Sequence, residues 1–469
     1  MSRFCSGSPC CSAFQITTIG AILSFVIGTI LGYQSGEELP EPVSTGQTWN
    51  STFDRPQEKD DKPEDPQSDL DVEKNVASYE QVWKTIKKLH WDEELVGESW
   101  DQAKEKYLPA VRDAKSMRDV RKAMESLIAE LGQSHFGVIP ADSYDDVETE
   151  SGGDGYAGLE FRLADQSTAL VTRVVKDSPA DQAGVKPGWK LLEFGDRKIA
   201  DQLSKLEQLK SNVMRTDTLA GLALTRRTTA GVGKTKRFLF EDLSGEQQEV
   251  KLEMIEQPGN LTRFGNFPEM RVSFESSTLD DGIGYFRFNM FFDPARVMKA
   301  YNNCVQDPAH ANGMIIDLRG NVGGLGAMTM GMARPFAKEQ TKLGTMMTRS
   351  SNLKFAVFPA LEPYEGKVAV LVDACSISSA EILSGGLQDI GAAKVFGQRT
   401  AGLALPSNVT KLPNGDGFQY AFANYISEKG KSLEKAGVTP DFPIELSTSA
   451  FKDNPDPVLN AAIDWIEPK

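Results

Sequence analysis

Apolar and polar positions alternate with different periods along this chain. Between residues 117 and 131, apolar side chains recur at steps of three and four, which predicts an amphipathic helix. Ser116 is a suitable N-cap and Gly132 follows the last apolar positions, so the helix should lie between them. It would deliver the chain directly to Ser134 and His135.

Short apolar runs bounded by glycine alternate with helical stretches in the C-terminal part, from about residue 258. The runs are GIGYFRF, NGMIIDLRG, GKVAVLVDA and AAKVFGQ. This alternation predicts an α/β fold with a mostly parallel sheet and crossover helices. In such folds ligands bind where strands end and helices begin. The stretch DACSISSAEIL, residues 373–383, lies at such a joint, and its small side chains are suited either to capping a helix or to nucleophilic catalysis.

The N-terminal region has the strongest compositional bias. After a short tail, residues 1–13, the stretch 14–33 contains no charged residue, and about 20 helical residues span the hydrocarbon core of a membrane. We therefore expect a transmembrane helix, with a cleaved signal peptide as the alternative. Arg3 precedes it and acidic residues follow, which predicts a body on the extracytoplasmic, periplasmic side. Residues 34–75 are rich in Pro, Asp, Glu and Ser, which predicts a disordered acidic linker.

Composition excludes several classes of function. The net charge of the 469 residues is −15, which disfavours nucleic acid as a partner, because phosphate contacts need clustered Lys and Arg. The five cysteines show no CxxC spacing, so the chain has the pattern of neither a zinc site nor a small disulfide scaffold.

Residues 152–257 have the pattern of a small β-rich domain. The piece SPADQAGVKPGWKLLEFGDRKI resembles a PDZ domain, with Gly184 and Gly188 as turns before a strand at 189–194. That resemblance implies that an extended peptide adds to a sheet edge, with its carboxylate held by loop N–H groups. The matching loop, GLEF, makes Gly158, Leu159 and Phe161 the candidate peptide-binding residues. The alternative is a β-domain whose glycines are purely structural.

Three motifs in order point to one family. DLRGNVGG (317–324), VLVDACSISSAEILSGGLQD (370–389) and LEKAGVTPD (433–441) follow the PDZ-like unit, and together they resemble the C-terminal processing, or tail-specific, serine peptidases. The resemblance implies a crotonase-like ββα-superhelix core over residues 258–469, a helical N-terminal part over 76–151 and an inserted PDZ domain. It also implies that Ser378 is the nucleophile.

The general base differs between the branches of that family. In the Ser-Lys branch the base is a lysine, but TAGLAL places Leu403 at the matching position, and Lys394 and Lys411 do not have the right spacing. The tricorn-like branch uses a Ser-His pair after a helix, which ELGQSHFG matches. The resemblance thus implies His135 as base, oriented by Ser134 and Glu434. A helix-capping histidine and a solvated glutamate are the alternatives.

The remaining candidates have weaker signals. Of the three histidines, His90 is predicted to be a surface or packing residue and His310 to lie in a loop. The backbone N–H groups of Ser379 and Gly323 are candidates for the oxyanion hole, although Val322 replaces a glycine of the family pattern. Cys375 is the competing nucleophile, and we expect it to be a buried small side chain.

The sequence therefore predicts a membrane-anchored serine endopeptidase acting on protein or peptide substrates. No metal or organic cofactor is required by this chemistry. The alternative is a non-catalytic relative that binds peptides as a scaffold, which Leu403 and Val322 favour.

Overall fold

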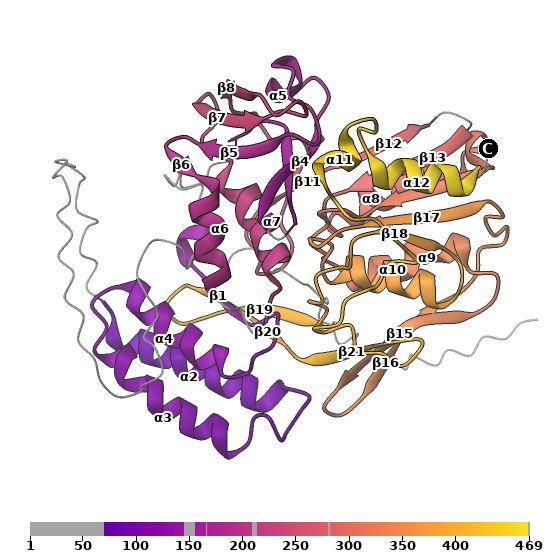
Figure 1. Cartoon of the computed structure of the whole chain (residues 1–469). Coiled ribbons are helices and arrows are strands. Elements are labelled where there is room, and N and C mark those ends of the chain that lie inside the picture. Colours follow the sequence, from indigo (N-terminus) through magenta and orange to yellow (C-terminus); the bar gives the residue numbers. More distant parts are fainter. Residues whose placement is uncertain (1–69, 145–154, 166, 209–212, 280–281, 468–469) are drawn as a thin grey trace, which may run out of the picture.

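A computed structural model describes residues 70–144, 155–165, 167–208, 213–279 and 282–467 (Figure 1). The expected membrane helix at 14–33 and most of the expected linker lie outside these residues. Within the described ranges, no helix has the length and apolar character needed to cross a membrane.

In the described chain, three helices follow one another from residue 72 to residue 129. They are α2 (Val72–Leu89), α3 (Glu98–Arg112) and α4 (Met117–Ala129). The last has the predicted bounds, because the Ser116 hydroxyl accepts a hydrogen bond from Asp119 N and Gly132 adopts a φ of +57°. The first begins a few residues before the expected position 76, because the Asp71 side chain caps it. A separate hydrophobic cluster, including Tyr79, packs the three helices together.

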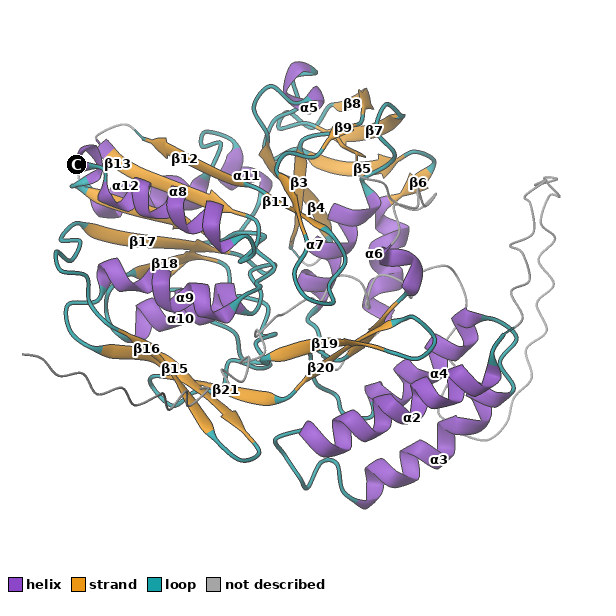
Figure 2. Cartoon of the chain, turned by 180° about the vertical axis from the view of Figure 1, so that it is seen from behind, coloured by secondary structure: helices purple, strands orange, loops and turns teal. Residues whose placement is uncertain are grey.

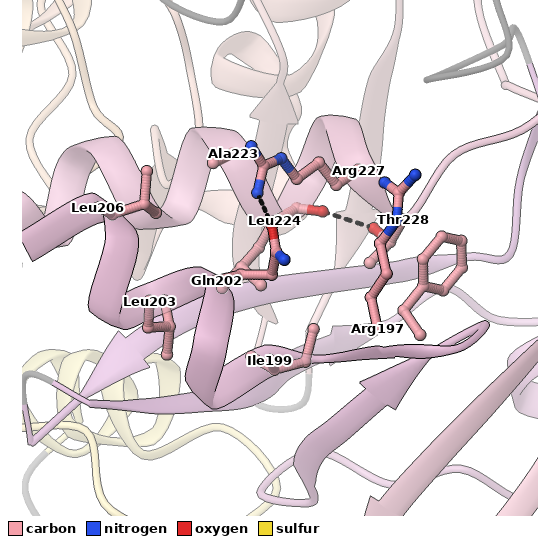
Figure 3. Close-up of a pocket in the computed structure, with 10 residues that line it drawn as sticks. Arg197, Ile199, Gln202, Leu203, Leu206, Ala223, Leu224, Arg227 and Thr228 are labelled. Atoms are coloured by element: carbon pink, nitrogen blue, oxygen red, sulfur yellow. Dashed lines mark hydrogen bonds between the residues drawn. The ribbon is translucent and has the colours of Figure 1, made fainter. Parts of the chain in front are cut away.

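The β-rich unit (155–256) contains a sheet in the order β3-β4-β5-β7-β8, with β6 beside β5 and α7 packed along β3. Helices α6 and α7 lie together and line a small pocket with apolar side chains such as Leu203 and Leu206 and polar ones such as Gln202 and Arg227 (Figure 3). That pocket holds none of the candidate site residues. The elements are β2 (Gly155–Tyr156), β3 (Leu159–Ala164), β4 (Thr168–Val174), α5 (Pro179–Gln182), β5 (Lys190–Phe194), β6 (Arg197–Lys198), α6 (Ile199–Gln208), α7 (Thr216–Arg227), β7 (Thr235–Glu241), β8 (Gln247–Glu253) and β9 (Ile255–Glu256).

The C-terminal core is built on a six-stranded sheet in the order β12-β13-β14-β17-β18-β22. The four predicted apolar runs are its adjacent parallel strands β13, β14, β17 and β18, and only β12 is antiparallel to its neighbour. The strands are β12 (Phe274–Thr278), β13 (Ile283–Phe288), β14 (Gly313–Asp317), β17 (Lys367–Val372), β18 (Lys394–Gly397) and β22 (Phe442–Pro443).

Helices cover both faces of this sheet (Figure 2). Ile283 and Tyr285 of β13 belong to the cluster with α12, whereas Phe286 and Phe288 belong to the cluster with α8, α9 and α10. This alternation follows from the two-residue period of a strand. The helices are α8 (Pro294–Gln306), α9 (Gly326–Ala333), α10 (Ser379–Asp389), α11 (Thr448–Phe451) and α12 (Pro457–Ile466).

Smaller sheets connect these parts. Strand β1 pairs with β20 and so joins the exit of α4 to the core, and β19 and β20 extend towards the helices (Figure 1). The remaining strands are β1 (Gly137–Ile139), β10 (Asn260–Thr262), β11 (Met270–Val272), β15 (Thr341–Thr348), β16 (Asn352–Val357), β19 (Ser407–Lys411), β20 (Gly417–Ala421) and β21 (Ala423–Ser427).

Candidate active site

Ser378 occupies a sharp turn between β17 and α10. Its φ of +58° and ψ of −114° lie in a region that L residues rarely adopt. Such a conformation costs about 1–3 kcal/mol and persists only when the surroundings impose it. The side chain is almost fully covered, because the residue is 2% exposed. The strand-to-helix joint predicted from the sequence is therefore present, and Ser378 precedes the first turn of the helix.

The neighbouring serines anchor the loop 373–378 instead of facing a common site. Ser376 Oγ donates to Leu318 O at 2.8 Å, and Ser379 Oγ donates to Gly324 O at 2.8 Å. Both acceptors lie at the ends of the glycine-rich stretch that follows β14. These two hydroxyls thus fix the position of the loop relative to that stretch.

Cys375 is buried against the β-rich unit, as expected of a small apolar side chain. A Cβ built on Gly221 of α7 would lie 2.5 Å from Cys375 Sγ, so the helix and the loop are in close contact. Thr218 Oγ1 on the same helix donates to Ala374 O at 2.8 Å. Burial raises the pKa of the Cys375 thiol to about 12, which leaves it protonated and a poor nucleophile.

Ser134, His135 and Glu434 come together although the glutamate is 300 positions further along the chain. Ser134 Oγ donates to Glu434 Oε2 at 2.8 Å, and Ser134 N donates to Glu434 Oε1 at 2.9 Å. The same Ser134 Oγ lies 2.8 Å from His135 Nδ1. Among the described residues Glu434 therefore makes no direct hydrogen bond to the imidazole and acts on it through Ser134.

These hydrogen bonds determine the tautomer of His135. When Glu434 is ionised, the Ser134 hydroxyl donates its single proton to that carboxylate, and the hydroxyl oxygen accepts the proton carried by Nδ1. Nε2 then carries the lone pair. Nε2 is buried and has no hydrogen-bond partner among the residues that the structure describes.

Burial controls the charge of this group. It lowers the pKa of His135 to about 3, so that the imidazole is neutral at physiological pH. It also raises the pKa of Glu434, although the donors from Ser134 and Ala404 oppose this shift.

Both other histidines have partners on both ring nitrogens: His90 contacts Gln133 and Asp92, and His310 contacts Thr278 and Cys304. Both are buried packing residues, so His90 is not at the surface.

A short backbone segment lies between Ser378 and Glu434, the carboxylate that binds Ser134. Ser378 N donates to Leu403 O at 3.0 Å, and the next residue, Ala404, donates its N–H to Glu434 Oε2 at 3.2 Å. Leu403, which stands at the lysine position of the other branch, is fully buried. Lys394, by contrast, forms an exposed ion pair with Asp441.

The glycine-rich loop 320–324 lies against the nucleophile position. A Cβ on Gly323 would lie 2.7 Å from Ser378 Cβ, and its φ is +87°, so only glycine fits here. The Gly323 N–H donates to Asn321 Oδ1 at 2.9 Å. It would have to leave this bond to serve an oxyanion, whereas Ser379 N lies in the first turn of α10, where N–H groups lack intrahelical partners.

The candidate peptide-binding loop lies at the boundary between the β-rich unit and the core. Gly158 has a φ of +84°, and Leu159 and Phe161 are buried in β3. The following residue, Arg162, donates to Asp373 Oδ2 at 2.5 Å. Asp373 Oδ1 also accepts from Gly320 N at 3.0 Å. The glycine-rich loop, the loop 373–378 and the β-rich unit therefore meet at one carboxylate.

Sequence reasoning assigned no role to two residues of this region. Asp373 connects three segments, and Glu381, three residues after Ser378, is fully buried. An acidic residue within the apolar stretch AEILSGGL was the available signal for Glu381. Nothing in the sequence marked the partners of either carboxylate, because several of them are backbone N–H groups.

Two family models match the chain. Peptidase family S41 matches residues 282–444, and the Tricorn protease C1 domain matches residues 73–129. A carboxyl-terminal-processing protease of a Synechocystis species is 24% identical over 392 residues, which cover 82% of this chain and 85% of the relative. Carboxy-terminal processing protease CtpA of Bacillus subtilis is 21% identical over 354 residues, covering 75% and 68%.

Solved structures share the fold. The photosystem II D1 C-terminal processing protease matches with a TM-score of 0.53 and 18% identity, over 82% of this chain and 96% of that chain. Mature CPAF in complex with lactacystin matches with a TM-score of 0.57 and 14% identity, over 85% and 99%.

Proposed function

Since the chain belongs to peptidase family S41 and is a serine-type peptidase, we propose that it is an endopeptidase with Ser378 as nucleophile and His135 as general base. The observation that carries this assignment is the Nε2 atom of His135. This atom is buried and bears the lone pair, and the other ring nitrogen, Nδ1, is hydrogen-bonded to Ser134. A neutral imidazole oriented in this way is suited to accept the proton of a serine hydroxyl.

The reaction would proceed through an acyl-enzyme. Ser378 Oγ attacks the carbonyl carbon of the peptide bond, its proton moves to His135 Nε2, and the oxyanion is stabilised by the N–H of Ser379. The C–N bond then breaks as the imidazolium returns the proton to the leaving amine. A water molecule attacks the ester and gives one proton to His135 Nε2. The acyl C–O bond then breaks as the imidazolium returns that proton to Ser378 Oγ, which restores the hydroxyl and the neutral imidazole. Ser134 and Glu434 keep the ring oriented throughout.

Substrate recognition is proposed for the β-rich unit, as a PDZ domain. Strand β3 is outermost in its sheet, α7 packs along it, and Gly158 provides the positive φ at its start. An extended peptide could add to this edge, with its terminal carboxylate on loop N–H groups. Peptides with a free carboxylate after an apolar residue should bind more tightly than their amidated forms. Equal affinity in calorimetry of the full chain would contradict tail recognition.

Residues 14–33 are proposed as an uncleaved anchor that holds the peptidase on the extracytoplasmic side of a membrane. The support is the absence of charge over this stretch and the acidic residues that follow it. The full chain should stay with membranes after a high-salt wash, and removal of residues 1–36 should release it. Unchanged membrane association of the shortened chain would contradict the anchor.

A scaffold without catalysis is the second candidate function. Leu403 in the lysine position and the near-complete burial of Ser378 favour it. Peptide hydrolysis separates the two. Ser378→Ala and His135→Ala should each reduce kcat to a similar low level, because members of one catalytic unit are not additive. Lys394→Ala and Lys411→Ala should keep most of the activity. A folded, unmutated chain that cleaves no peptide would favour the scaffold.

A further inference from the structure

Glu381 is a buried carboxylate in the first turn of α10. Its residue is 0% exposed, and its side chain has no role in the chemistry described above. A buried carboxylate is unfavourable unless several donors satisfy it. Four groups donate to this one: Thr400 Oγ1 at 2.6 Å, Gly402 N at 2.7 Å, Leu403 N at 3.0 Å and Ser378 N at 3.0 Å, whose N–H is shared between Glu381 and Leu403 O.

The four donors divide evenly between the two oxygens. Oε1 accepts from Thr400 and Gly402, and Oε2 accepts from Leu403 and Ser378. An ionised carboxylate offers about four lone-pair positions, so its capacity is filled. A glutamine in this place would present an NH₂ group to two of these donors. The site therefore requires a carboxylate and not only a polar side chain of that size.

Two buried carboxylates hold consecutive N–H groups of one segment. Glu381 holds Gly402 and Leu403, and Glu434 holds Ala404 at 3.2 Å. Glu381 also binds the backbone of Ser378, whereas Glu434 also binds Ser134, the partner of the imidazole. The segment 402–404 thus lies between the proposed nucleophile and the residues that orient the proposed base.

We propose that Glu381 is a positioning residue that sets the spacing of Ser378 and His135 by holding the segment 402–404 and the strained backbone of Ser378. This inference rests on the proposed function and names a further residue that the chemistry requires. Leu403, at the lysine position, is consistent with this proposal. Its N–H donates to Glu381, its carbonyl oxygen accepts from Ser378 N, and its side chain is buried in the core.

The test compares Glu381→Gln with Ser384→Ala, a matched control on the same helix. Ser384 is equally buried, but its hydroxyl donates only to carbonyl groups of its own helix. A displacement of about 1 Å lowers rates by about 100-fold, so Glu381→Gln should lose about that factor in kcat. Its KM should change less than threefold, because the β-rich unit is not altered. Ser384→Ala should keep kcat.

Thr400 supplies a second pair of variants in case Glu381→Gln does not fold. Its hydroxyl donates to Glu381 and accepts from Val438 N at 2.7 Å. Thr400→Val should lower kcat by at least tenfold, and Thr400→Ser should restore it, since the hydroxyl returns. Wild-type kcat in folded Glu381→Gln or Thr400→Val would overturn the proposal.

Labelling of Ser378 by a fluorophosphonate separates this proposal from the proposed function. If wild type is labelled and Glu381→Gln is labelled about 100-fold more slowly, the positioning role is supported. Equal rates in both refute that role and leave the proposed function intact. No reaction in wild type refutes the proposed function, and with it the positioning role.

Discussion

The contact between α7 and the loop 373–378 can be tested by adding one methyl group. Gly221→Ala places a Cβ 2.5 Å from Cys375 Sγ and 3.6 Å from Arg162 Cδ. In an open helix the substitution is favourable by about 1 kcal/mol, because alanine has the better helix propensity. Overpacking of a filled core costs about 1–3 kcal/mol. The net change in unfolding free energy should therefore lie between zero and a loss of about 2 kcal/mol.

Removal of the thiol should relieve this clash. Gly221→Ala combined with Cys375→Ala should show a coupling energy of about 0.5–3 kcal/mol in urea unfolding. Because Cys375 lies three residues before Ser378, peptidase activity should fall in Gly221→Ala and recover in the double variant. Gly331→Ala in α9 is the control, since its Cβ would meet only the terminal methyl of Met298 at 3.0 Å. Additive effects with unchanged activity would refute the packing argument.

Three further predictions concern charges. Asp416→Ala should lower the unfolding free energy measured in urea by about 3–5 kcal/mol. The reason is that the Asp416 carboxylate is fully buried and binds Arg121 of α4 at 2.9 Å. A loss below about 1 kcal/mol would contradict this. Burial keeps His135 neutral in the folded chain down to about pH 3, whereas the unfolded chain binds its proton below about pH 6.5. This residue should therefore lower the unfolding free energy of wild type by about 1.4 kcal/mol for each pH unit between 6.5 and 3. In acid unfolding, His135→Ala should lose less stability over the same range. Glu434→Gln should lower kcat less than His135→Ala in a peptide assay, because it acts through Ser134.

Local patterns in the sequence were enough to predict the elements that position the site. Ser116 and Gly132 bound α4 as expected, and the glycine-bounded apolar runs are the parallel strands of the core. Those signals are local: a cap, a positive φ and a period of apolar residues. They were sufficient to place Ser378 between a strand and a helix.

Local patterns could not predict the hydrogen bonds and the ion pair that join residues distant in sequence across the site. Glu381 binds backbone N–H groups about 20 positions away, and backbone groups carry no sequence signal. The ion pair of Arg162 with Asp373 joins residues 211 positions apart and depends on how the β-rich unit packs against the core. The proximity of Ser134 and Glu434 could be expected only from the family resemblance, which implied both residues but not that the serine would lie between the glutamate and the imidazole.

Mass-spectrometric mapping of a fluorophosphonate adduct tests the central claim most directly. The label should be found on Ser378 in the unmutated chain, because a serine activated by a neutral imidazole attacks phosphorus as it would attack a carbonyl. It should be almost absent from folded His135→Ala, in which no base accepts the hydroxyl proton, and present in Lys394→Ala. An adduct on another residue, or one formed at the wild-type rate without His135, would contradict the assignment of Ser378 and His135.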